Sequence, residues 1–207
     1  MNEKFFDLRK EKQDRIINAA LKVFALNGYR RASTDEIITE AGISKGLLFH
    51  YFGSKISLYA FLFDYATRYA IVELKSGVPR DESDYFRLQR MITAAETDLM
   101  RQYPYIFLFL DTAGREQDAE AAEVVREKKD DLASCVEGLI SGADRSLFPR
   151  PSDVTKLTKL LHYSRTGLMK DRLAEKDFDP LKLSDDIISG IDLAENLLKF
   201  SYGKRSE

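Results

Sequence analysis

Residues 42–55 read GISKGLLFHYFGSK, and this stretch carries the strongest information on the fold. Its large apolar and aromatic side chains surround the helix axis, whereas a helix that only packs on a core keeps one face polar. They are Leu47, Leu48, Phe49, Tyr51 and Phe52. Some of these side chains must therefore face away from the protein's own interior and toward a partner.

The same stretch contains the second of two short helices joined by a tight turn. We expect the first helix to be capped by Ser33 or Thr34 and to end at Gly42. Ser44 is expected to cap the second helix, which reaches about Phe52. Two short helices with a glycine turn form a helix-turn-helix.

Helical spacing separates the inner and outer faces of the second helix. Leu48 and Phe52 are four residues apart and share one face, which we expect to pack inward. The outward residues are expected to be Gly46, Leu47, Phe49 and His50. In a DNA major groove, glycine permits close backbone approach, the apolar side chains contact thymine methyl groups, and histidine donates to a base or a phosphate.

Residues around this helix suit contact with the DNA backbone. Lys45, Tyr51 and Lys55 are expected to reach phosphates. The helix N-termini at Thr34 and Ser54 present backbone N–H groups that favour anions. The distribution of charge also favours DNA binding by this region. Residues 1–55 hold ten Lys and Arg against seven Asp and Glu, although the whole chain has a net charge of −2.

Composition limits the class of protein. The 207 residues, 44% of them hydrophobic, suffice for a substantial core. The longest apolar run, YPYIFLFL, has eight residues and is too short for a membrane span, and no apolar signal-peptide region follows the charged amino terminus. With one cysteine, Cys135, we expect a soluble cytoplasmic protein without membrane contact.

Nearly every segment has helical periodicity, so we expect an all-α protein with about nine helices. YPYIFLFL alone could be a buried strand, but nothing else alternates to pair with it, and Pro104 suits a helix start. The expected helices cover about 9–27, 33–42, 44–52, 54–72, 84–101, 103–112, 118–142, 152–173 and 181–202. On the fourth helix, Leu58, Phe61, Leu62, Tyr65, Tyr69 and Val72 are expected on the buried side.

The run from Ile16 to Leu58 resembles the DNA-binding region of the TetR family of tetracycline-repressor-like transcription regulators. The motifs that carry the resemblance are Phe24-x-x-x-Gly28-Tyr29, Ser33-Thr34-x-x-Ile37, AGISKG (41–46), HYF (50–52) and the following Lys55. The resemblance implies an all-helical homodimeric repressor whose carboxy-terminal domain encloses a small-molecule effector that lowers DNA affinity. It places these residues on DNA-facing positions: Thr34, Ser44, Lys45, Gly46, Leu47, Phe49, His50, Tyr51 and Lys55. Leu47 and Phe49 lack the hydroxyls often found there, which favours apolar contact with thymine.

An aromatic-rich helical region after residue 54 is either solid core or the lining of a ligand cavity. We assign candidate effector contacts to Tyr65, Tyr69, Phe86, Tyr103, Phe107, His162, Thr166 and Met169. His162 could equally be a satisfied buried histidine.

The last two helices each have two apolar sides, one for the chain's own core and one for a second copy. The side assigned to the dimer interface contains Leu157, Leu161, Ser164, Leu168, Ile187, Ile191, Ala194 and Leu198. The alternative is that these are interior helices of a monomer.

We therefore interpret residues 1–53 as a helix-turn-helix DNA-binding domain and residues 54–207 as a helical ligand-binding and dimerisation domain. The expected partners are a pseudo-palindromic double-stranded DNA operator, a small, largely apolar or aromatic effector, and a second copy. Two histidines and one cysteine disfavour a metal site, and no phosphate-binding glycine loop or nucleophile elbow is present, so we expect no cofactor and no enzyme activity. The alternative is a helical small-molecule-binding protein or enzyme that retains a helix-turn-helix.

Overall fold

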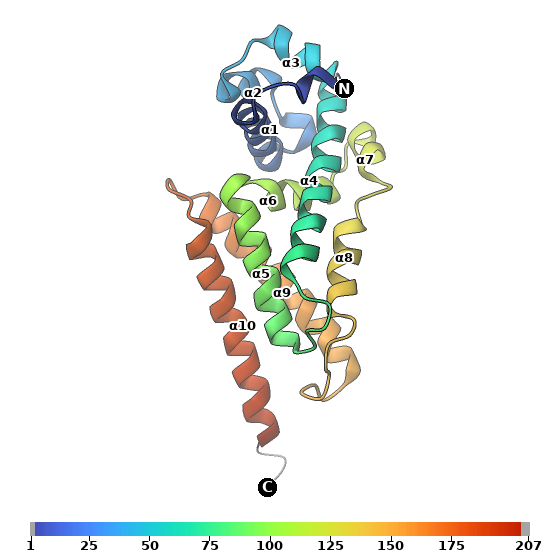
Figure 1. Ribbon diagram of the computed structural model, residues 1–207, viewed down its shortest axis with the longest axis vertical. Coiled ribbons are helices and arrows are strands. Elements are labelled where there is room, and N and C mark those ends of the chain that lie inside the picture. The colour runs from blue at the N-terminus through green and yellow to red at the C-terminus, as the bar shows by residue number, and fades with distance from the viewer. Residues whose placement is uncertain (1–2, 204–207) are drawn as a thin grey trace. The chain divides into compact units, whose positions relative to one another are not determined.

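The computed structural model describes residues 3–203, and all regular elements within them are helical, as predicted (Figure 1). They comprise one short 3-10 helix and ten α-helices, one more than expected. The elements are η1 (Glu3–Phe5), α1 (Lys10–Arg31), α2 (Thr34–Ala41), α3 (Lys45–Phe52), α4 (Lys55–Gly77), α5 (Tyr85–Gln102), α6 (Ile106–Gly114), α7 (Ala119–Val125), α8 (Asp131–Ile140), α9 (Pro151–Leu173) and α10 (Pro180–Gly203). No helix in this range is long and apolar enough to cross a membrane.

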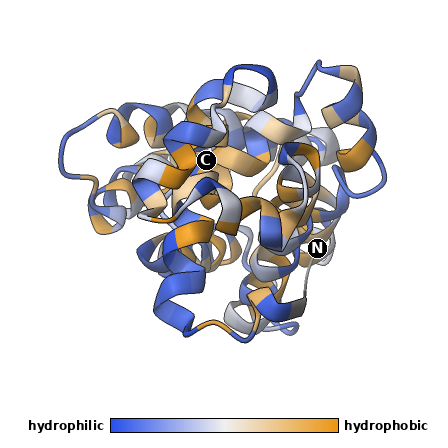
Figure 2. Cartoon of the chain, turned by 90° about the horizontal axis from the view of Figure 1, so that it is seen from above, coloured by the Kyte–Doolittle hydropathy of each residue, from blue (hydrophilic) through white to orange (hydrophobic). Residues whose placement is uncertain are grey.

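Contacts divide the chain into two compact units. Unit 1 contains the described residues up to Ile71 together with Leu99–Ala133, and unit 2 contains Val72–Asp98 together with the residues from Ser134 onward. Most helices mix hydrophilic and hydrophobic residues along their length (Figure 2), the composition of amphipathic helices that bury one face. The predicted domain boundary after Gly53 concerns function and stays a prediction.

The predicted helix over 118–142 is divided in two, which accounts for the additional helix. Residues 126–130 read REKKD, five charged residues without an apolar one to bury, and they form turns. The Lys128 ammonium is paired with Asp64, and this ion pair holds the turn against α4. Helix α7 therefore ends at Val125, and α8 begins at Asp131.

In the apolar run YPYIFLFL, the helix prediction is confirmed over the strand alternative. Helix α6 starts at Ile106, two residues after Pro104. Its buried side chains include Leu108 and Phe109, and the Phe109 ring lies 5.5 Å from that of Tyr59. Phe24 of α1 completes this aromatic cluster, with its ring centroid 5.0 Å from that of Tyr59.

Gly28 interrupts α1 where the sequence predicted the helix to stop. Its φ of 68° and ψ of 173° are not helical, although one further turn follows. A side chain at this φ would be strained. The break turns Tyr29 inward, where its ring stacks beside that of Phe24.

The buried face of α4 differs in part from the prediction. Leu58, Leu62 and Tyr65 are buried as expected. Tyr69 and Val72 are exposed, because the buried stripe turns along the helix through Ala66, Ala70 and Leu74. Three other α4 residues are also buried, namely Tyr59, Phe63 and Thr67.

Candidate DNA interface

Helices α2 and α3 form the predicted helix-turn-helix. Ser33 caps α2, since its Oγ accepts a hydrogen bond from the Asp35 N–H at 3.2 Å, which selects Ser33 over Thr34 as the cap. Gly42 ends α2 in the left-handed conformation, with φ 61° and ψ 44°. Ser44 caps α3 by accepting from the Leu47 N–H at 3.3 Å.

The two faces of α3 have the predicted burial. Leu48 is 1% exposed and Phe52 2%, so both fasten the helix to unit 1. On the other side Ser44, Lys45, Gly46 and His50 are exposed, and Leu47 and Phe49 are half-buried. The exposed backbone and the partly exposed apolar side chains form a surface that could enter a DNA groove.

Tyr51 packs mainly inside the protein. The residue is buried, and its ring contacts Phe5 and His50 at centroid distances of 5.8 and 5.4 Å. Its ring therefore belongs to the packing behind α3. A contact of its hydroxyl with phosphate stays a prediction.

The two predicted phosphate-binding lysines differ in their surroundings. The exposed Lys45 ammonium is 2.9 Å from Asp35, so α3 and α2 are linked by an ion pair at their N-termini. Lys55 is half-buried, with Nζ 4.6 Å from the Tyr29 ring centroid. Burial lowers the pKa of Lys55, and the nearby acids Asp118 and Glu116 oppose this effect. Thr34, the first residue of α2, is half-buried.

An acidic anchor on the loop after α6 holds the end of α1. The Tyr29 N–H donates to Glu116 Oε2 at 2.8 Å, and the Tyr29 hydroxyl donates to Glu120 at 3.1 Å. Burial, followed by the bond to Glu120, raises the pKa of Tyr29 to about 12. A Cβ at Gly28 would lie 3.5 Å from Glu116 Oε2. Sequence reasoning missed this anchor, since Glu116 is 87 residues from Tyr29.

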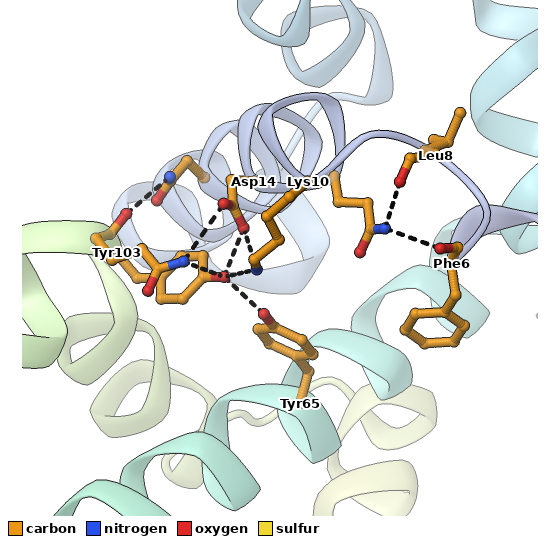
Figure 3. A network of polar contacts seen from close by, with 9 residues as sticks. Phe6, Leu8, Lys10, Asp14, Tyr65 and Tyr103 are labelled. Atoms are coloured by element: carbon orange, nitrogen blue, oxygen red, sulfur yellow. Dashed lines mark hydrogen bonds and ion pairs between the residues drawn. The ribbon is translucent and has the colours of Figure 1, made fainter.

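A polar network connects α1 to α4 and to the residue that follows α5 (Figure 3). The Tyr103 hydroxyl donates to Asp14 at 2.6 Å, accepts from Lys10 at 2.8 Å, and lies 2.6 Å from the Tyr65 hydroxyl. Burial alone would raise the pKa of Asp14, but the bonds from Lys10 and Tyr103 outweigh it, so this pKa is lowered. Tyr65 also stacks on Tyr69 at 4.3 Å.

These contacts divide the predicted effector-binding residues into two groups. Tyr65, Tyr69, Tyr103 and the half-buried Phe107 belong to unit 1. There, Tyr65 and Tyr103 belong to the network just described. Phe86, Thr166 and Met169 are buried in unit 2, whereas His162 is exposed and so is not a core histidine.

Unit 2 contains a buried polar cluster that sequence reasoning missed, formed by Gln89, Thr93 and Glu96 of α5 and Arg165 of α9. Arg165 Nε lies 3.2 Å from a Glu96 oxygen, and its Nη2 donates to the Thr93 hydroxyl at 3.0 Å. Burial raises the pKa of Glu96, and Arg165 opposes this. Gln89 Nε2 has no hydrogen-bond partner among the described residues. The spacing 89, 93, 96 on one helix face was the available signal.

Two surface depressions lie in unit 2, and no predicted effector-binding residue lines either one. The larger, of about 420 Å³, is lined by Leu168, Asp171, Arg172, Glu175, Asp186 and Ser189. The smaller, of about 230 Å³, is lined by Ser83, Asp84, Tyr85, Asp144 and Leu147. Tyr85 lies on α5, one helical turn before Gln89. Its hydroxyl is also 2.8 Å from the Thr158 hydroxyl. Within residues 3–203, no cluster of acidic, histidine and cysteine side chains could hold a metal ion.

The predicted dimer residues on α9 and α10 are placed mainly on the inward side. Leu161, Ile187 and Ile191 are buried within the single chain. Leu157, Leu168, Ala194 and Leu198 are half-buried, and Ser164 is exposed. The outward apolar residues are instead Leu160 (63% exposed), Tyr163 (53%), Leu193 (61%), Leu197 (58%) and Phe200 (64%). The side predicted for the dimer interface is therefore the more buried one in the single chain, and the use of either side in a dimer stays a prediction.

Comparison with known proteins agrees with this geometry. Residues 16–60 match the family of bacterial regulatory proteins, tetR family. An uncharacterised HTH-type transcriptional regulator of Bacillus subtilis, YuxN, is 41% identical over 76 residues, which cover 34% of this chain and 26% of YuxN. The transcriptional activator FasR of Mycolicibacterium smegmatis is 43% identical over 51 residues, which cover 25% of this chain and 23% of FasR. The chain thus spans about a quarter of the length of these curated relatives.

The fold of the whole chain is also known. A TetR-family regulator from Chloroflexus aurantiacus has a TM-score of 0.59 and 22% sequence identity to this chain, with 97% of each chain covered. The match over residues 16–60 contains α2, α3 and most of α1, which form the helix-turn-helix with its supporting helix. In this amino-terminal region, residues 16–60, the chain is similar to the tetR family of bacterial regulatory proteins.

Proposed function

We propose that the protein is a transcription regulator that binds a pseudo-palindromic operator as a homodimer, represses from it, and is released by a small effector. The matched relatives are named as transcriptional regulators, which favours this function over the enzyme alternative. The outward face of α3 would lie in the major groove, with the N-termini of α2 and α4 toward phosphates.

Gly46 is the observation that carries the proposal. It has no positive φ, and a Cβ added there would meet nothing within 4 Å. Neither backbone conformation nor packing within the chain therefore requires glycine, which costs a helix roughly 0.5–1 kcal/mol relative to alanine. A partner that approaches the backbone closely explains it.

The test uses a labelled fragment from upstream of the protein's own gene, competed with unrelated DNA over a salt series. Tight, competitor-resistant binding is expected, and Gly46→Ala should weaken it by about 1–3 kcal/mol, the usual cost of overpacking a tight contact. Gly138→Ala in α8, another exposed glycine with open space around it, is the matched control and should bind like the wild type. Binding without sequence preference that vanishes steeply with salt would contradict the proposal.

The homodimer would use the outward side of α9 and α10, including Leu160, Tyr163 and Leu193. Their exposure in the single chain supports this choice over the predicted inward set. Sedimentation at micromolar concentration should give about twice the chain mass of 23.7 kDa. Leu160→Glu with Leu193→Glu should yield monomers, while Leu26→Glu, an exposed leucine of unit 1, should not. A wild type that sediments as a monomer would exclude the dimer.

For the effector, we place the binding region in unit 2 at the buried polar cluster. An apolar molecule with one hydrogen-bonding group would satisfy Gln89 Nε2, and the depression at Tyr85 offers an approach. Release follows by population shift: an effector that prefers the conformation with displaced α3 helices lowers operator affinity, and operator lowers effector affinity by the same factor. An effector that binds at saturation without changing operator affinity would refute this coupling.

A further inference from the structure

The segment before α1 provides an observation that the sequence did not predict. Its residues are charged or apolar without periodicity, yet Phe5 of η1 is 0% exposed, while the adjacent Phe6 is 51% exposed. The fully buried Phe5 ring shows that this short segment packs against the rest of unit 1.

Phe5 packs directly behind the DNA-reading helix. Its ring centroid lies 5.0 Å from that of Phe52 and 5.8 Å from that of Tyr51, both in the last turn of α3. Its other ring neighbours are Phe61 of α4, at 5.6 Å, and the adjacent Phe6, at 5.5 Å. Aromatic rings at these separations are in favourable contact. Phe5 thus fills the space between the end of α3 and α4.

The backbone of the segment is fixed as well. The Gln13 side chain of α1 donates from Nε2 to the carbonyls of Phe6 at 3.1 Å and Leu8 at 2.8 Å (Figure 3). The Leu8 N–H donates back to the Phe5 carbonyl at 3.3 Å. The Gln13 side chain therefore fixes the turn that places the Phe5 ring against α3.

We infer that Phe5 is a positioning residue for DNA recognition, which sets the angle at which α3 presents Leu47, Phe49 and His50. The inference rests on the proposed function. Apart from η1, α3 has few supports: α2 precedes it through the Gly42 turn, and Leu48 and Phe52 are its inward anchors. Without the Phe5 ring, Tyr51 and Phe52 each lose one ring contact, and Phe52 keeps Phe61 of α4 at 5.3 Å. The space left behind the last turn of α3 allows this turn to tilt.

The experiment compares Phe5→Ala and Phe5→Leu in the full chain with the control Leu26→Ala, which changes an exposed apolar residue of α1. Operator binding and binding to unrelated DNA are measured at one salt concentration. Phe5→Ala should reduce the specific-to-non-specific affinity ratio about tenfold or more, the effect of a lost base contact. Non-specific affinity should be unchanged, since phosphate contacts alone supply it. Phe5→Leu should restore most of the ratio, and Leu26→Ala should leave it unchanged.

Amide hydrogen exchange gives a readout that does not need DNA. In Phe5→Ala, protection should fall in α3 at 48–52 and persist in α1 at 16–21, where Ile16, Ile17 and Leu21 are buried. If Phe5→Ala unfolds, the folded Phe5→Leu variant should show a smaller loss of both the ratio and α3 protection. A wild-type ratio in folded Phe5→Ala would overturn the inference, as would equal loss of protection in α1 and α3. Where Phe5→Ala unfolds, wild-type α3 protection in Phe5→Leu would overturn it. A wild type without operator preference would overturn the proposed function instead, and the exchange result would identify which of the two had failed.

Discussion

Removal of the Tyr103 hydroxyl should destabilise unit 1, because this hydroxyl is the centre of the polar network between α1 and α4. Tyr103 is completely buried, and a phenol has one proton, which it donates to Asp14 at 2.6 Å. The Tyr65 hydroxyl at 2.6 Å must therefore be the donor in its bond to Tyr103. Tyr103→Phe removes both bonds at once. It also removes the bonds that Tyr103 accepts from Lys10 and Gln102, but these two donors keep their bonds to Asp14.

The magnitude follows from these two bonds. A hydrogen bond to a charged group contributes about 1.5–3 kcal/mol, and a buried hydroxyl left without an acceptor costs about 1–3 kcal/mol. Because Asp14 keeps its bond from Lys10 at 2.6 Å, we take the lower end of both ranges and expect a loss of about 3 kcal/mol. Tyr65→Phe, which removes only the donor, should cost about 1 kcal/mol.

Urea unfolding at fixed protein concentration measures these losses, since dimerisation would make stability concentration-dependent. The double variant Tyr65→Phe with Tyr103→Phe should lose less than the sum of the single losses by about 1 kcal/mol, because it leaves no unpaired Tyr65 hydroxyl. The control is Tyr105→Phe, a half-buried neighbour, which should change stability by less than about 0.5 kcal/mol. If Tyr103→Phe matched the control, or if the two losses were additive, the network would not stabilise the protein as argued.

Three further predictions concern unit 1. Leu48→Ala should lower the free energy of unfolding by about 2–5 kcal/mol by opening a cavity under α3; urea unfolding checks this, and a loss near zero would show that Leu48 is not an anchor. Gly28→Ala should lower the free energy of unfolding by about 1–2 kcal/mol, because alanine is strained at a φ of 68°. The control Gly138→Ala should leave stability unchanged or raise it in the same thermal scans. Equal unfolding midpoints for the two variants would argue against the break in α1. The pKa of Asp14 is lowered in the folded state, so its contribution is present above its unfolded pKa of about 3.9 and is lost as pH falls through the lower folded value. Asp14→Asn should therefore be less stable than wild type at pH 7, with a difference that shrinks below about pH 4; a constant difference would contradict this sign.

Much of the fold could be predicted because its signals are local. Helical period, caps and glycine stops lie within a few residues of each other, so Ser44, Gly42 and the Leu48–Phe52 face were identified from spacing alone. The same holds for the choice of helix over strand at α6. The break between α7 and α8 was missed, because a run of charged residues is also compatible with an exposed helix. The ion pair between Lys128 and Asp64, which accompanies the turn, is visible only in the tertiary structure.

The candidate sites depended more on contacts between distant residues. Sequence separated two apolar sides on α9 and α10, but which of them faced inward depended on the helices they pack against, and Leu161 and Ile191 proved to be core. The aromatic residues assigned to an effector fell partly into unit 1, where Tyr65 and Tyr103 bond to each other and Tyr103 bonds to Asp14, 89 residues away.

The sequence by itself determined an all-helical chain, the helix-turn-helix at 33–52 and the side chains that α3 turns inward and outward, because helical geometry relates residues three and four apart. Only the tertiary structure decided that Phe5 lies behind α3, that Glu116 holds Tyr29, and that Arg165 pairs with Glu96 inside unit 2. Each of these contacts joins residues 47 to 87 positions apart. They form because burial requires every polar group to find a partner and every space to be filled, and no local pattern specifies which distant residue does so.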